Sequence, residues 1–163
     1  MKMFKFRILS LAGLLILIVS TFALIGFRHQ TGQIDRPQLK SILQQLGYDV
    51  KDLDATEGKE KYSINATQGG LNIPIAFEIS SNNTYIWLTV FLTADAPDGT
   101  MATNLLKKNA DIQPSQFYIT SSGKLMMGVP IENHEVTNAV IRQKTTDILD
   151  HVVDTKDVWQ KSP

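Results

Sequence analysis

The three histidines are the side chains best suited to acid–base or metal chemistry near neutral pH, and they are scattered along the chain. His29 precedes the first predicted helix, whereas His134 and His151 lie near the two ends of the last one. Asp147 and His151 are four residues apart, which places them on one helix face, and Asp154 is close by. Two or three ligands on a solvated helix are fewer than a closed metal site requires. We therefore predict a surface pair here and no bound metal.

Other chemical motifs are missing from the sequence. Ser80, Ser81, Ser121 and Ser122 lie in polar turns without the strand–turn–helix elbow that activates a nucleophile. The adjacent Gly69 and Gly70 separate two predicted strands instead of opening a helix, so they predict a turn and not a phosphate loop. The chain has no cysteine, which excludes thiol catalysis, thiolate metal sites and disulfides. The sequence thus predicts no catalytic residue and no cofactor.

The charge balance argues against partners that are recognised by charge. Sixteen Lys and Arg residues balance sixteen Asp and Glu residues in a chain of 163 residues. A chain without net charge has no overall field to draw it toward nucleic acid or an anionic lipid surface. We expect one folded domain that does not bind nucleic acid.

One predicted strand, from Thr84 to Leu92, is apolar on both faces. Its even-numbered side chains, such as Ile86 and Leu88, point one way, and its odd-numbered ones point the other way. A sheet that helices cover on one face usually carries polar residues on the other. A loop, a helix or a second subunit covers the second face, or that face is an exposed surface that binds an apolar segment of another protein. The residues of this surface, with two from a following hairpin, are Tyr85, Trp87, Phe91, Tyr118 and Met126.

Hydrophobic periodicity predicts the elements that would position this surface. A helix from Asp35 to Gly47 is followed by strands near 61–66, 71–79 and 84–92, a short helix near 101–109, and strands near 117–120 and 125–129. Met101, Leu105 and Leu106 are predicted on one side of the short helix. The last helix is predicted to be capped by Asn133 and to end near Asp154. The order α-βββ-α-ββ-α predicts an α+β fold with an antiparallel five-stranded sheet.

The N-terminus predicts a membrane span. Residues 8–27, bounded by Ile8 and Phe27, carry no charge and follow Lys2, Lys5 and Arg7. A helix of this length is about 30 Å long and spans a bilayer, and the basic residues predict a cytoplasmic N-terminus. We expect a signal-anchor over 1–28, a linker over 29–34 and a domain over 35–157, single-pass in the inner membrane with the domain extracytoplasmic. The alternative is a signal peptide cleaved after Ala23, which would release a secreted domain.

Three local features resemble a known fold. They are a glycine–tyrosine pair after the first helix (Gly47, Tyr48), an asparagine-rich turn before an aromatic strand (Asn82 to Trp87) and a hairpin with Gly123. With the element order, they resemble the type III secretion chaperone-like fold, most closely its YbjN-type branch of sensory-transduction regulators. The resemblance implies an antiparallel sheet packed on helices, frequent homodimers and binding of protein partners without catalysis.

We therefore expect a membrane-anchored, non-catalytic interaction or regulatory domain whose protein partner the sequence does not identify, with a homodimer as one form of partner. The alternative from another class is a small-molecule-binding domain or an enzyme, with a pocket between helices and sheet that residue spacing does not reveal.

Overall fold

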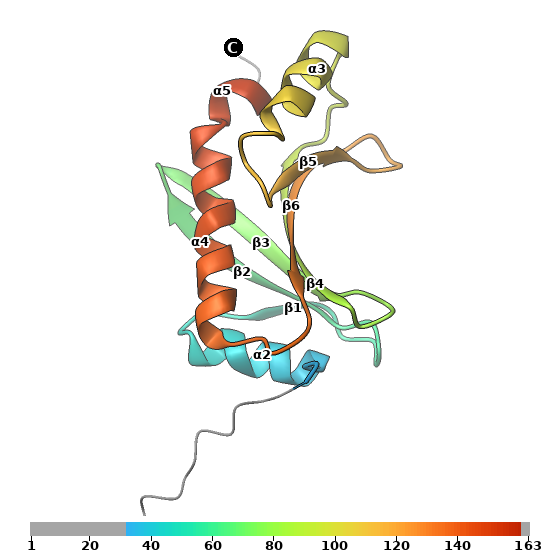
Figure 1. Ribbon diagram of the computed structural model, residues 1–163, viewed down its shortest axis with the longest axis vertical. Helices are drawn as coiled ribbons and strands as arrows, with labels where there is room; N and C mark the ends of the chain where they lie inside the picture. Colours follow the sequence, from blue (N-terminus) through green and yellow to red (C-terminus); the bar gives the residue numbers. More distant parts are fainter. Residues whose placement is uncertain (1–31, 161–163) are drawn as a thin grey trace, which may run out of the picture.

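The computed structural model describes residues 32–160, in which a six-stranded antiparallel sheet curves around two helices (Figure 1). Along the sheet the strand order is β1-β2-β3-β4-β6-β5. The elements are α2 (Arg36–Gln45), β1 (Lys51–Asp54), β2 (Lys61–Gln68), β3 (Leu71–Ile79), β4 (Tyr85–Thr93), α3 (Gly99–Lys108), β5 (Gln116–Ile119), β6 (Leu125–Glu132), α4 (Asn138–Asp154) and α5 (Lys156–Trp159).

Helix α2 begins where the sequence predicts it. The Asp35 carboxylate accepts from the Gln38 backbone N–H at 2.8 Å, and the Gln38 side chain accepts from the Asp35 N–H at 2.8 Å. This reciprocal capping box satisfies two backbone donors that a helix start otherwise leaves without partners. Leu39 and Leu43, one turn apart, are buried against the sheet side of the helix. The first predicted helix is therefore confirmed.

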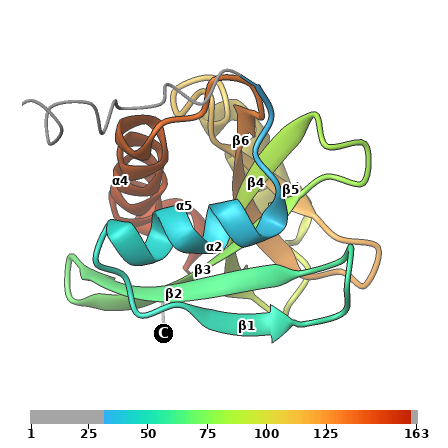
Figure 2. The ribbon, with the colours of Figure 1, turned by 90° about the horizontal axis from the view of Figure 1, so that it is seen from below.

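The core lies between the sheet and helices α2 and α4, on what we call the inner face of the sheet. Figure 2 shows both helices on the same side of the curved sheet. Alternate residues of the long strands point inward, and Phe77 of β3 lies opposite Leu88 of β4, both fully buried. Helix α4 closes this core with Ile141 and Ile148, each also fully buried. The opposite side of the sheet is the outer face.

The predicted count of five strands is wrong, because β1 adds a sixth at the edge. Lys51 and Asp52 pair with Ser63 and Tyr62 of β2. The strand reads Lys-Asp-Leu-Asp, and its first three residues are exposed. An edge strand with charged side chains has no apolar alternation to identify it, and such charges also discourage pairing with other chains. The sequence of this strand therefore resembles that of a polar loop, and the strand was not predicted.

The last helix also starts later than predicted. Its N-cap is Thr137, whose hydroxyl accepts from the Val140 N–H at 3.2 Å, and not Asn133. Asn133 is buried and uses its side-chain amide elsewhere. Its Oδ1 accepts from the Ile34 N–H at 3.0 Å, and its Nδ2 donates to the Ile34 carbonyl at 3.0 Å and to the Asn83 carbonyl at 2.9 Å. Asn133 therefore does not cap the helix. Its side chain links three segments of the chain by hydrogen bonds, an arrangement that we call the Asn133 tie.

The prediction that the chain is a membrane protein needs correction as well. No helix within residues 32–160 is long and apolar enough to cross a bilayer. The predicted span between Ile8 and Phe27 lies outside the described residues. The transmembrane helix, the single-pass inner-membrane location and the extracytoplasmic placement of the domain therefore have no support from the structure, and they take no part in the function proposed below.

We expect Gly69→Ala to lower the free energy of unfolding by about 2 kcal/mol. Gly69 has φ +56° in the turn between β2 and β3, and a Cβ there would lie 2.6 Å from Cγ1 of Val153. The substitution thus adds a steric overlap to the backbone strain. Gly70, with φ +75° and open space around it, is the matched control, and Gly70→Ala should lose only about 1 kcal/mol. Urea unfolding measures both, and equal losses would show that Val153 moves aside freely.

Candidate protein-binding surface

The five residues singled out from the sequence all lie on the outer face. Tyr85, Trp87 and Phe91 come from β4, Tyr118 from β5 and Met126 from β6. The residues that alternate with them on β4 and β6, including Leu88 and Met127, are buried on the inner face. The alternation along each strand therefore separates a core side from this second side, which we call the aromatic surface (Tyr85, Trp87, Phe91, Tyr118, Met126).

Three of these residues form one row across three strands. Met126 of β6 lies opposite Phe91 of β4 on one side and opposite Tyr118 of β5 on the other. Residues paired in this way on one face have Cβ atoms about 5 Å apart, so these three side chains are neighbours on the outer face. The ring of Tyr118 also reaches over Gly128, where a Cβ would lie 3.1 Å from its Cε1. Glycine at 128 thus leaves room for the tyrosine ring to lie flat on the sheet.

The other two residues form a second group at the far end of β4. The Tyr85 and Trp87 rings have centroids 6.4 Å apart and are tilted by 55°. Trp87 lies opposite Pro130 of β6 and Glu78 of β3. Thr89 lies between this pair and the Phe91 row, on the same face of the strand. The surface is therefore two apolar groups joined across Thr89 and Gly128.

All five side chains keep contact with solvent in a single copy of the domain. Phe91 is 51% exposed and Tyr85 is 38% exposed, while Trp87, Tyr118 and Met126 are half-buried. Helix α4, which packs on β2, β4 and β6, contributes its buried residues to the inner core. Within residues 32–160 this face of the sheet is therefore only partly covered.

Charged groups border the aromatic surface. Lys61 and Glu78 form an ion pair at 2.7 Å across β2 and β3. Glu132 lies opposite Tyr85 at the other side of the surface and is exposed. Burial raises the pKa of the Tyr118 hydroxyl, and the nearby Glu78 carboxylate raises it further. An apolar centre with a charged border is the usual arrangement of a protein–protein interface.

The raised pKa of Tyr118 predicts a loss of stability at alkaline pH. The unfolded tyrosine ionises near its usual value of about 10, while the folded one keeps its proton to higher pH. The contribution of Tyr118 is thus fully present below that value and decreases as the pH rises toward the folded pKa. In Tyr118→Phe we expect a smaller fall in unfolding free energy between about pH 9 and about pH 11 than in the parent chain. Tyr62, whose pKa is also raised by burial, is present in both proteins, so an unchanged slope would contradict the prediction.

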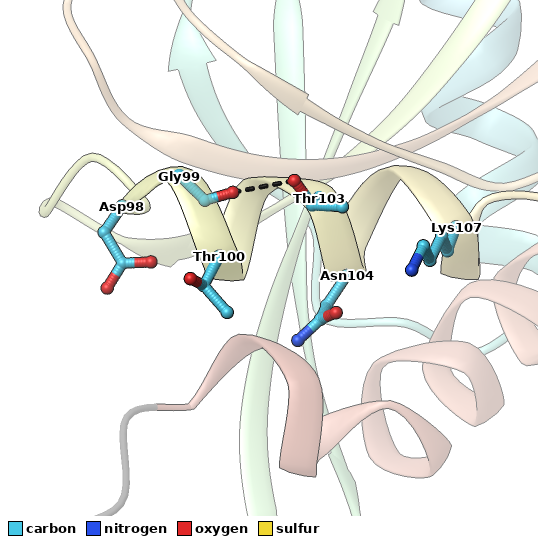
Figure 3. A pocket seen from close by; sticks show the side chains of 6 residues that line it. All are labelled: Asp98, Gly99, Thr100, Thr103, Asn104 and Lys107. Carbon is cyan, nitrogen blue, oxygen red and sulfur yellow. Dashed lines mark hydrogen bonds between the residues drawn. The ribbon is translucent and has the colours of Figure 1, made fainter.

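A polar hollow of about 530 Å³ lies along α3 (Figure 3). The Asp98 carboxylate caps the helix by accepting from the Met101 N–H at 2.8 Å, and the Thr103 hydroxyl donates to the Gly99 carbonyl at 2.8 Å. The six residues that line the hollow all belong to α3 and its N-cap. They are Asp98, Gly99, Thr100, Thr103, Asn104 and Lys107. Because no second element contributes a converging group, the hollow does not assemble a catalytic arrangement.

Asp147 and His151 do not come together as a metal site. The Asp147 carboxylate accepts from Gln143 at 2.7 Å and from Lys144 at 2.9 Å. His151 Nδ1 lies 2.9 Å from the hydroxyl of Ser115, which is 1% exposed and so inaccessible to a substrate. Within residues 32–160 no group of three histidine or carboxylate side chains is arranged to hold a metal ion. The Asp147 contacts thus lie within α4, and the His151–Ser115 contact ties α4 to the segment before β5.

Sequence reasoning missed a second apolar surface, next to β5. Leu106 was predicted on the same helix side as Leu105, but Leu105 is buried and Leu106 is 71% exposed. Ile119, two residues after the buried Phe117, is 49% exposed. An apolar groove of about 150 Å³ lies between α3 and β5, lined by Ala102, Leu105, Leu106, Phe117, Tyr118, Ile119 and Leu125. Adjacent leucines cannot both face one core, and this was the signal available in the sequence.

The fold of the described residues is similar to that of type III secretion chaperones in solved structures. The ExsC–ExsE complex contains a chain with a TM-score of 0.59 and 12% identity, over 80% of this chain and 100% of that one. The heterodimeric ExoU–SpcU complex from the type III secretion system of Pseudomonas aeruginosa contains another, with a TM-score of 0.53 and 12% identity, over 75% and 98%. No family model and no curated protein sequence matches the chain. The similarity to these solved structures therefore establishes the fold of the chain and nothing more specific.

Proposed function

We propose that this chain is a non-catalytic protein-interaction domain that binds an apolar segment of a partner protein on its aromatic surface. The observation that carries the proposal is the second apolar side of β4. The domain already has a complete core on the inner face, so Tyr85, Trp87 and Phe91 are not needed to cover a helix. A monomer that keeps such side chains together on an open sheet face usually uses them in binding.

The residue types suit the binding of an apolar segment. Tryptophan and tyrosine provide large contact areas with few rotatable bonds, and they are frequent among the residues that dominate binding energy. Met126, in the middle of its row, has a flexible side chain that can adapt to different partner shapes. Lys61 and Glu78 at the border would remain hydrated and set the orientation of the bound segment.

The comparisons support the proposal at the level of the fold. The two structures named above are complexes between two proteins, ExsC with ExsE and ExoU with SpcU. The finer assignment to the YbjN-type branch rests on Gly47, Tyr48 and the asparagine-rich turn before Trp87, and we propose it on those residues alone. The alternative, a small-molecule-binding domain or an enzyme, would require a pocket with converging polar groups. The polar hollow on α3 lacks such convergence, which favours the interaction domain.

Site-specific photo-cross-linking in cells that express the full chain tests the proposal. With a benzoyl-phenylalanine in place of Phe91, we expect a cross-link to a distinct protein, and Trp87→Ala should reduce its yield about tenfold or more, as for the loss of a central aromatic anchor. A probe at Asn65, which is exposed on polar strand β2, is the matched control and should give no such product. Equal cross-linking from Asn65, or a yield that does not change in Trp87→Ala, would contradict the proposal.

A further inference from the structure

Two carboxylates flank the Tyr85–Trp87 end of the aromatic surface. Glu132 of β6 lies opposite Tyr85, and Glu78 of β3 lies opposite Trp87. The residues that alternate with these four along the three strands are buried, so all four lie on the outer face of the sheet. The two aromatic rings on β4 therefore have a negative charge on each side, one from β3 and one from β6.

The Tyr85 and Trp87 rings are arranged to accept a cation. Their centres are 6.4 Å apart and their planes are tilted by 55°. A cation beside them can therefore lie within about 6 Å of both centres, the range in which an aromatic face attracts it. The chain makes such a contact elsewhere, where Lys40 Nζ lies 5.7 Å from the centre of the Tyr62 ring. Within residues 32–160 no cation lies over Tyr85 or Trp87, so these rings are open to one from outside the described domain.

Glu132 is the carboxylate available to pair with that cation. It is exposed, and its carboxylate forms no ion pair or hydrogen bond with the part of the chain that the structure describes. Glu78 already has a partner, because Lys61 lies 2.7 Å from it. A free carboxylate beside two rings suits a guanidinium group, whose plane stacks on an aromatic ring while its N–H groups donate to the carboxylate oxygens.

We propose that the partner segment carries an arginine that lies against the Tyr85 and Trp87 rings and pairs with Glu132. The inference rests on the proposed function and adds the chemistry and the direction of the bound segment. Trp87 and Phe91 are four residues apart on β4, which is about 13 Å along a strand. In an extended segment that follows β4, the arginine is therefore about four positions from the apolar residue that contacts the Phe91 row.

Cross-linking from the Phe91 probe in the full chain separates this inference from the proposed function. Glu132→Gln removes the charge and keeps the size of the side chain, and we expect it to lower the yield of the cross-linked product about fivefold. Glu57→Gln, in the exposed turn between β1 and β2, is the matched control and should leave the yield unchanged. A yield that Trp87→Ala reduces and Glu132→Gln does not would overturn the arginine contact and leave the interaction domain standing. A yield that neither substitution changes would contradict both.

Two synthetic peptides test the chemistry of the site on the purified full chain. Both are capped and alternate leucine with serine, and one ends in arginine while the other ends in citrulline, which has a similar shape without the charge. The chain has two tryptophans, so the indole N–H signals of Trp87 and Trp159 can be followed separately by NMR. Trp159 donates to the Val152 carbonyl at 2.9 Å, away from the outer face, and is the internal control.

We expect the arginine peptide to shift the Trp87 signal at a concentration about fivefold lower than the citrulline peptide, since only the arginine peptide carries the cation. The Trp159 signal should not move with either peptide. In Glu132→Gln the preference for arginine should disappear, whereas in Glu57→Gln it should remain. An equal response to the two peptides, no response to either, or a preference that survives in Glu132→Gln overturns the proposal.

Discussion

Phe77→Ala is expected to lower the free energy of unfolding by about 3 to 5 kcal/mol, the largest loss of any single substitution considered. Phe77 is fully buried in the middle of β3, opposite Leu88, and is among the largest side chains of the core. Removing its ring loses the transfer free energy and leaves a cavity that surrounding strands cannot close. Urea or thermal unfolding measures the loss.

Trp87→Ala is the comparison, because it removes an even larger aromatic ring from the other face. Trp87 lies in the next strand, opposite Glu78, the residue that follows Phe77. Its side chain is half-buried and open to solvent, so no closed cavity forms, and we expect a loss of about 1 kcal/mol. Similar losses for both substitutions would mean that the outer face is as much a part of the core as the inner one.

Asn133→Ala is expected to lower the free energy of unfolding by about 3 kcal/mol. The substitution leaves the Ile34 N–H, the Ile34 carbonyl and the Asn83 carbonyl without their partner. Each buried polar group that loses its hydrogen bond costs about 1 to 3 kcal/mol, reduced here to the extent that water enters the space. Asn133→Asp should also destabilise, because a carboxylate cannot donate to the two carbonyls.

Asn138→Ala is the control for Asn133. The Asn138 side chain is exposed and makes one long hydrogen bond, 3.4 Å, to Gln45. Its replacement should change stability by no more than about 0.5 kcal/mol. If Asn133→Ala were equally mild, the three hydrogen bonds would contribute little, and the tie between the segments would depend on apolar packing around Ile34.

Most helices and strands could be predicted because their residues carry a clear local signal. Helix α2 has its capping residues, and β2, β3 and β4 alternate apolar and polar or aromatic side chains as half-buried strands do. The signal was absent for β1, whose apolar Leu53 is exposed at the sheet edge. Asparagine is a common helix cap, so the residue type at 133 predicted a cap. The fold instead brings Asn133 next to Ile34, which is distant in sequence, and the two residues form hydrogen bonds.

The candidate site was predictable in its residues but not in its exposure. The pattern of β4 placed Tyr85, Trp87 and Phe91 on one face, because strand periodicity is local. Whether that face is open depends on where the helices pack, which the sequence pattern does not specify. The groove at Leu106 and Ile119 was missed for the same reason, since α3 and the end of β5 extend past the part of the sheet that α4 covers.

The Asn133 tie also determines how the domain responds to a pulling force. Next to it, the Glu135 N–H donates to the Gly32 carbonyl at 3.2 Å, so Gly32 and Ile34 are both bound to the segment between β6 and α4. Tension applied to the chain ahead of Gly32 therefore reaches these hydrogen bonds before it reaches α2. Because several of them bear the load together, they must break together. We therefore expect these hydrogen bonds to resist a force applied ahead of Gly32, with Asn133 linking Ile34 to the segment that follows β6.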